Sequence, residues 1–143
     1  MNPVVVARSV DSVEAYIAQR AASAAKQTYG YPFAASTRRF AFVACDGVDG
    51  PQTGALLMTV AGGVATLDGL ELEPARQAGV AASALLARFE ETASYNNCHK
   101  AWARVKRGGE TDVLLSGAGY RCAGIVERHY FQFDFVDMVK WLA

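Results

Sequence analysis

The chain has 143 residues, a length typical of one domain, and 52% of its residues are hydrophobic while 20% are charged. This composition provides enough apolar mass for a folded core and excludes an intrinsically disordered chain. Basic and acidic residues are balanced at 14 each, so the charge predicts binding neither to nucleic acid nor to an anionic membrane surface. We therefore expect a single domain over residues 1–143.

Cysteines and histidines give no sign of a metal site or a disulfide framework. Cys45, Cys98 and Cys122 are widely spaced without a CxxC pair, and the two histidines are isolated, so no metal is predicted. We expect reduced, mostly buried thiols, because disulfides are rare in the cytosol. The N-terminus lacks the basic lead and long apolar core of a secretory signal, and no apolar run is long enough to span a bilayer. These features favour a cytoplasmic protein.

The first elements expected in chain order are a strand at Val4–Arg8 and a helix over residues 12–26. Asp11 is the expected N-cap of this helix, with Glu14 placed as in a capping box. One helix face is apolar at every fourth position, as shown by Val13, Ile17 and Ala21. The loop that follows is rich in aromatic residues, namely Tyr29, Tyr31 and Phe33.

Strands dominate the middle of the chain and are separated by turns rich in glycine. The three expected strands are Arg39–Cys45, Ala55–Val60 and Val64–Glu73. Asp68-Gly69 lies inside the third of these. An Asp-Gly pair between apolar runs indicates either a hairpin or a bulge in one long strand, and the residues alone leave both open.

The second half of the chain alternates between helices and strands. We expect a helix from about Gly79 to Tyr95 and a short helix that begins at Thr111 or Asp112. The expected strands are Ala101–Lys106, Tyr120–Val126 and Phe131–Leu142. Strands outnumber helices and several are joined by tight turns, so the sequence predicts a mixed sheet in an α/β (α+β) fold.

The start of the helix after Pro74 carries no acidic residue before Glu90. This is unusual, because the exposed N–H groups and the dipole of a helix start attract Asp and Glu. Instead the chain places Arg76 and Gln77 there, followed by the small residues Ala78, Gly79, Ala81 and Ala82. Small side chains let an anion approach the unpaired N–H groups, so the pattern favours a phosphate or pyrophosphate site. The alternative is an alanine-rich helix start packed tightly on the sheet.

The segment Arg76-Gln77-Ala78-Gly79-Val80-Ala81 reads as R/Q-x-x-G-x-G/A, placed between LELEP and SALLARFEE. It resembles the acetyl-coenzyme A motif of the GNAT superfamily of N-acetyltransferases. The order of elements agrees along nearly the whole chain, and AGYRCAG resembles the Gly-aromatic start of the family's sixth strand. The resemblance implies a GNAT-like mixed, mostly antiparallel sheet of six to seven strands flanked by three to four helices. It also favours the bulge over the hairpin at Gly69.

The resemblance implies a binding site for acetyl-CoA as cosubstrate. Backbone amides from Gln77 to Ala82 would hold the pyrophosphate with help from Arg76, and the strand around Glu71 would pair by its backbone with the pantetheine arm. A backbone N–H near Leu72 would polarise the thioester carbonyl. The residues expected to bind the cosubstrate are Leu70, Leu72, Arg76, Gln77, Ala78, Gly79, Val80, Ala81 and Ala82.

The resemblance implies a catalytic base and a general acid, but this sequence matches the family only for the base. The family often uses a carboxylate near its fourth strand as base, which makes Glu71 and Glu73 the candidates here. The alternative is that both glutamates simply face solvent on a half-buried strand and have no catalytic role. The usual general acid is a tyrosine four residues before the glycine of the Gly-aromatic pair. Counting back from Gly119 gives Leu115, which is a departure from the family pattern.

Two functions follow from this resemblance. The first is an acetyl-CoA-dependent N-acyltransferase that moves an acetyl group by direct transfer to a primary amine of an unidentified acceptor. The second is an acyl-CoA-binding module with weak or lost catalysis, as the leucine at the tyrosine position suggests. The acceptor would bind where the aromatic loop after residue 26 meets the sheet, near His129–Phe131. Family members are often dimers, so a homodimer is one expectation, and no nucleic-acid or membrane partner is expected.

Overall fold

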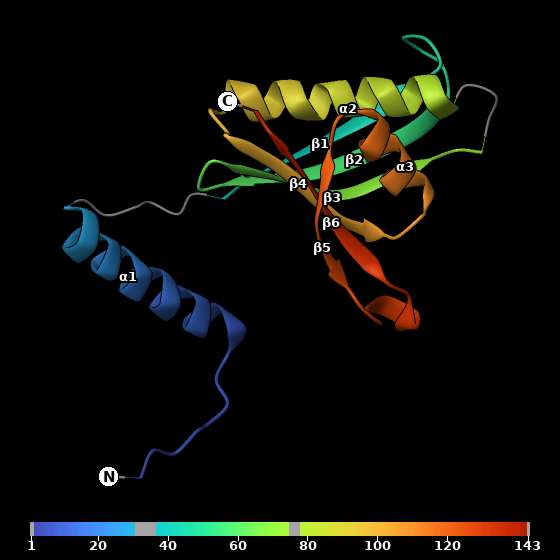
Figure 1. Cartoon of the computed structure of the whole chain (residues 1–143). Helices are drawn as coiled ribbons and strands as arrows, with labels where there is room; N and C mark the ends of the chain where they lie inside the picture. Colours follow the sequence, from blue (N-terminus) through green and yellow to red (C-terminus); the bar gives the residue numbers. More distant parts are fainter. Residues whose placement is uncertain (1, 31–36, 75–77, 143) are drawn as a thin grey trace. The chain divides into compact units, whose positions relative to one another are not determined.

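The computed structural model describes residues 2–30, 37–74 and 78–142. The chain divides into two units, Met1–Ser36 and Thr37–Ala143. The first unit contains one helix, α1, and the second contains every described strand together with helices α2 and α3 (Figure 1).

Helix α1 spans Val10–Tyr29 and begins earlier than expected. Its N-cap is Ser9, whose side chain accepts a hydrogen bond from the Ser12 N–H at 3.3 Å, so the prediction of Asp11 as N-cap is wrong. Asp11 lies instead in the first turn, where a carboxylate favours the helix dipole. The predicted strand at Val4–Arg8 is also wrong, because residues 2–9 lack the neighbouring strand that a ladder requires.

The second unit is built on a six-stranded sheet in the order β1-β2-β3-β4-β6-β5. Its strands are β1 Arg38–Cys45, β2 Gln52–Ala61, β3 Val64–Leu72, β4 Lys100–Lys106, β5 Arg121–Val126 and β6 Phe135–Trp141. Every neighbouring pair is antiparallel except β3 with β4. The prediction of a mixed, mostly antiparallel sheet is therefore confirmed.

Helices α2 (Ala78–Tyr95) and α3 (Glu110–Gly117) pack on one face of this sheet (Figure 1). Side chains alternate along β2, so Leu56, Met58 and Val60 are buried on the face that α2 covers. The residues of α2 in the same core are Leu85, Leu86, Phe89 and Ala93. Helix α3 contributes Leu115 to the same core. The two helix spans are within a few residues of those predicted from the apolar spacing.

The bulge predicted near Gly69 is confirmed. Leu57 of β2 pairs with Gly69, while the next residue, Met58, pairs with Leu67. Asp68 is therefore the extra residue on β3, and the strand continues past it instead of turning back. The Thr59 hydroxyl donates a hydrogen bond to the Asp68 carboxylate, which satisfies the side chain of the bulged residue.

The strand predicted at Phe131–Leu142 begins later, at Phe135. Residues Tyr130–Gln132 form a 3₁₀ turn, η1, in which Phe131 and Gln132 have φ angles of 53° and 64°. These left-handed backbone angles are incompatible with a strand. The aromatic residues 131 and 133 thus belong to the connection between β5 and β6, and not to the ladder.

A half-buried ion pair ties the strand β6 to both helices. The Lys140 ammonium donates to both carboxylate oxygens of Glu90 on α2, at 2.9 and 3.2 Å, and to the Ala118 carbonyl after α3 at 3.0 Å. The Tyr120 hydroxyl donates to the same carboxylate at 3.3 Å. Burial, and then the negative charge of Glu90, raise the pKa of Tyr120, so this hydroxyl stays a neutral donor.

The three cysteines are unpaired, but the expectation that they are mostly buried is wrong. Cys45 and Cys122 lie exposed on the two edge strands β1 and β5, and Cys98 alone is buried. Edge strands lack a neighbour on one side, so the position of a residue in the sheet overrides the usual preference of cysteine for the interior.

The turn between β2 and β3 provides a test of this packing. Gly62 and Gly63 both have positive φ, but a Cβ at Gly63 would lie 2.8 Å from His99 Nδ1 whereas a Cβ at Gly62 would contact nothing. Gly62→Ala should cost about 1 kcal/mol of unfolding free energy from backbone strain alone. Gly63→Ala should cost about 1–3 kcal/mol more, because His99 must also move. Urea denaturation of both variants measures the difference, and equal losses would contradict the described contact.

Candidate functional site

The candidate site lies where strands β3 and β4 separate. The two strands pair in parallel only where Val64–Thr66 faces Lys100–Trp102, and beyond these residues they diverge (Figure 1). The edge of β3 from residue 67 to residue 72 therefore has no strand partner on its β4 side. Unpaired N–H and C=O groups on a strand edge can bind an extended chain.

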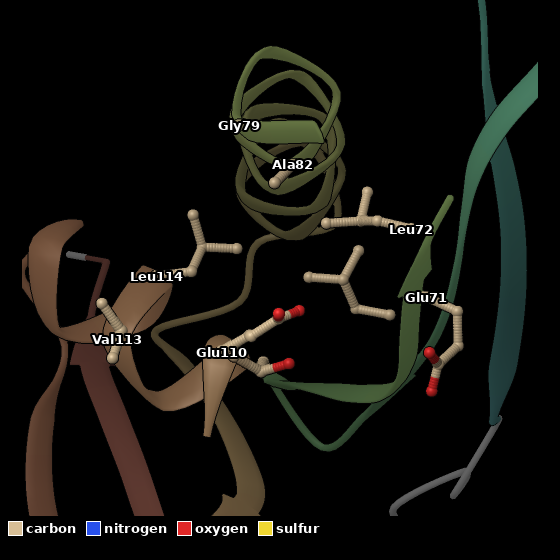
Figure 2. A pocket seen from close by; sticks show the side chains of 9 residues that line it. Glu71, Leu72, Gly79, Ala82, Glu110, Val113 and Leu114 are labelled. Atoms are coloured by element: carbon tan, nitrogen blue, oxygen red, sulfur yellow. The ribbon is translucent and has the colours of Figure 1, made fainter. Parts of the chain in front are cut away.

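A cavity of about 430 Å³ occupies the space between these elements. Its walls come from β3, from the start of α2 and from the start of α3 (Figure 2). The residues that line it are Leu70, Glu71, Leu72, Gly79, Ala82, Glu110, Thr111, Val113 and Leu114. Most of these side chains are apolar, so the cavity fits a narrow, largely uncharged group that runs along the open strand edge.

The start of α2 closes one side of the cavity. Its first turn has no acidic residue, and a Cβ added at Gly79 would contact nothing within 4 Å, so the backbone is open to a ligand there. Ala82 is buried and lines the cavity, Ala81 is buried beside it, and Val80 points away with 70% of its surface exposed. A helix start of this kind attracts an anion. Arg76 and Gln77, which were predicted to help hold the pyrophosphate, lie outside the described residues.

The two predicted bases lie at the edge of the site. Glu71 and Glu73 are both exposed, and both line a smaller hollow of about 200 Å³ beside β2, whereas only Glu71 also lines the main cavity. The Glu71 side chain leaves β3 on the side opposite Leu72 (Figure 2), as strand alternation requires. Glu110 and Thr111 line the cavity from the first turn of α3, where the sequence had predicted no site residue. Their position directly after Gly108-Gly109, at a helix start, was the signal available.

Leu115 occupies the core and not the cavity. Its exposure is 0%, and it packs within the cluster that includes Met138 and Val136. The adjacent Ser116 donates a hydrogen bond to Asp112 at 3.3 Å within α3. Neither residue lines the cavity, so the described residues place no hydroxyl at the position where the family carries its tyrosine.

The predicted acceptor region is described only in part. Tyr31 and Phe33 lie outside the described residues, and the side chain of Tyr29 is not described either. His129 packs against Tyr130 and Phe135, with ring centroids 4.5 and 5.1 Å apart. The His129 ring thus belongs to an aromatic cluster at the connection between β5 and β6.

No helix among the described residues combines the length and the apolar character that a bilayer crossing requires.

Known proteins resemble this chain in fold. No protein-family profile and no curated protein matches it. Among solved structures, an acetyltransferase from Bacillus cereus ATCC 14579 superposes with a TM-score of 0.72 at 17% identity, over 97% of this chain and 98% of its own. The ribosomal-protein-S18-alanine N-acetyltransferase from Escherichia coli has a TM-score of 0.62 at 18% identity, over 100% of this chain and 95% of its own.

A third similar structure is a nourseothricin acetyltransferase, with a TM-score of 0.62 at 21% identity over 73% of this chain and 66% of its own. A GNAT-family structure from Desulfovibrio desulfuricans superposes with the same score over 73% of the chain. The chain therefore has the GNAT fold, as the resemblance of the motif around Gly79 predicted.

The burial of Leu115 predicts that a tyrosine cannot simply be restored there. Leu115→Tyr should lower the free energy of unfolding by about 1–3 kcal/mol through overpacking, and Leu115→Ala by about 2–5 kcal/mol through a cavity. The control is Ser116→Tyr, which adds the same ring at the exposed neighbouring position and should change stability by less than about 0.5 kcal/mol. Chemical denaturation measures all three, and a Leu115→Tyr variant as stable as the parent would show that the site accepts the ring.

Proposed function

We propose that this protein is an acetyl-CoA-dependent N-acyltransferase that moves an acetyl group directly to a primary amine. One observation carries the proposal: an unpaired edge of β3 faces an acid-free helix start across a mostly apolar cavity. An acyl-CoA has matching parts, namely an extended amide-containing arm, a pyrophosphate and a short acyl group. The fold shared with acetyltransferases supports the same assignment.

The residues proposed to hold the cosubstrate divide into two groups. The backbone amides from Gln77 to Ala82 would bind the pyrophosphate, with Gly79 and Ala82 allowing close approach and Arg76 adding positive charge. The backbone at Leu70 and Leu72 would pair with the pantetheine amides, while their side chains cover its apolar part. Pairing of this kind supplies hydrogen bonds to an edge that otherwise has none on that side.

Acyl transfer requires two proton transfers and stabilisation of one developing charge. A base takes the first proton from the ammonium, and the neutral amine then attacks the thioester carbonyl to form the C–N bond. The C–S bond breaks, and the second proton, lost by the amine nitrogen, goes to the departing thiolate. Glu71 and Glu73 are the proposed bases, directly or through water, and both line the hollow beside β2. A backbone N–H of β3 near Leu72 would stabilise the oxyanion.

A binding module without catalysis is the second candidate function, and the buried Leu115 favours it. A domain of this kind would keep the cavity and the helix start but lack a proton donor for the departing thiolate. The acceptor does not follow from the similar structures, because those named for an acceptor act on different molecules.

The helix start is tested by Gly79→Glu, which should abolish acetyl-CoA binding in calorimetry because it places a carboxylate at the proposed pyrophosphate site. The added side chain has open space, so the fold should persist. Ala84→Glu is the matched control, since it adds the same charge on an exposed part of α2 outside the cavity and should bind normally. Undiminished binding by Gly79→Glu would refute the site.

Release of free CoA distinguishes the two candidate functions. An enzyme should release CoA from acetyl-CoA faster when a primary amine is added, whereas a binding module should show only slow release that is independent of amine. A thiol-reactive dye follows the reaction against a blank that contains the protein without acetyl-CoA, because the exposed Cys45 and Cys122 also react with the dye. Across a panel of amines, a rate that never rises above the amine-free rate would favour the binding module.

A further inference from the structure

The cavity contains negative charge and no positive charge among its described lining residues. Two of these residues, Glu71 and Glu110, carry carboxylates, and none is a lysine, arginine or histidine. The remaining walls are apolar apart from Thr111. A charged group that enters this space therefore meets a carboxylate with no described cation beside it.

The two glutamates differ in direction. Figure 2 shows the Glu71 carboxylate on the outer side of β3, away from Leu72 and Ala82. The Glu110 carboxylate instead points from the start of α3 into the space bounded by Leu72, Ala82 and Leu114 (Figure 2). Of the two, Glu110 is therefore the charge that a bound group would meet.

Glu110 and Asp112 are the two acidic residues in the first turn of α3, and no side chain caps this helix start with a hydrogen bond. The Asp112 carboxylate accepts the Gly108 N–H at 2.7 Å and the Ser116 hydroxyl at 3.3 Å. Glu110 has no hydrogen-bond or ion-pair partner among the described residues. Its carboxylate is thus available to act on whatever occupies the cavity.

We infer that Glu110 makes the cavity selective for neutral acyl groups and excludes acyl chains that end in a carboxylate. The inference rests on the proposed function. The start of α2 and Glu110 lie on facing walls of the same cavity (Figure 2), so an acyl group that occupies this cavity lies close to Glu110. Glu110 is exposed, and a second carboxylate beside it meets a like charge at the protein surface, where the effective dielectric constant is lower than in bulk water.

Two acyl-CoA ligands with four-carbon chains, butyryl-CoA and succinyl-CoA, test this directly, because they differ in the terminal carboxylate. Calorimetric titration of the full chain should give butyryl-CoA an affinity at least about tenfold higher than succinyl-CoA. Glu110→Gln removes the charge and keeps the shape, so the ratio should fall to about threefold or less. Glu110→Lys should favour succinyl-CoA. Thermal melting checks that each variant is folded.

Glu71→Gln is the matched control, since it removes a carboxylate that lines the same cavity but points away from it. This variant should keep the selectivity of the parent. Equal binding of both ligands by the parent, or loss of selectivity in Glu71→Gln and not in Glu110→Gln, would overturn the inference while leaving the proposed function intact. Failure of the parent to bind either ligand would instead refute the proposed function itself.

Discussion

The site depends on one geometric event, the end of the parallel pairing between β3 and β4. Three residues on each strand pair, and the ladder then stops. The bulge at Asp68 comes two residues after the last paired residue of β3, Thr66. A bulge bends a strand and increases its twist, so it provides a physical reason for the divergence. Without the divergence, β4 would cover the edge of β3 and no cavity would form beside Leu70 and Leu72.

The diverging strands need support from the helices that lie above them. Phe89 of α2 and Leu115 of α3 are fully buried on the same face of the sheet, and Lys140 links the two helices through Glu90 and the Ala118 carbonyl. Leu115 is buried between α3 and the sheet, and the polar groups of α3 that line the cavity, Glu110 and Thr111, come from its first turn.

Much of this architecture could be predicted from local patterns. The acid-free start of α2 and the strand at Ala55–Val60 are each properties of a few adjacent residues, and each was predicted from the sequence. The Asp68-Gly69 pair left a hairpin and a bulge open, and the resemblance to the GNAT superfamily favoured the bulge. The errors have different causes. Ser9, and not Asp11, is the N-cap of α1, because its side chain accepts the Ser12 N–H. The strand expected at residues 4–8 requires a neighbouring strand, which the pattern of these residues alone cannot predict.

Candidate site residues were predictable only on β3 and α2. Glu71 and Glu110 both line the cavity, but the direction of each carboxylate depends on how strand and helix face one another, which spacing along the chain does not determine. The aromatic residues after position 130 predicted a strand because they recur at every second position, as in a strand with one buried face. The left-handed backbone at Phe131 and Gln132 becomes evident only in three dimensions.

The place of β6 in the sheet has a consequence for biosynthesis. β6 is the last described strand in chain order, yet it lies between β4 and β5 and provides the pairing for both. As the chain leaves the ribosome, β1 to β3 can pair with one another at once, whereas β5 has no neighbour until β6 emerges. β4 can already pair with β3, but β5 joins the sheet only after β6 has been synthesised, so the part of the sheet beneath α3 forms later than the part beneath α2.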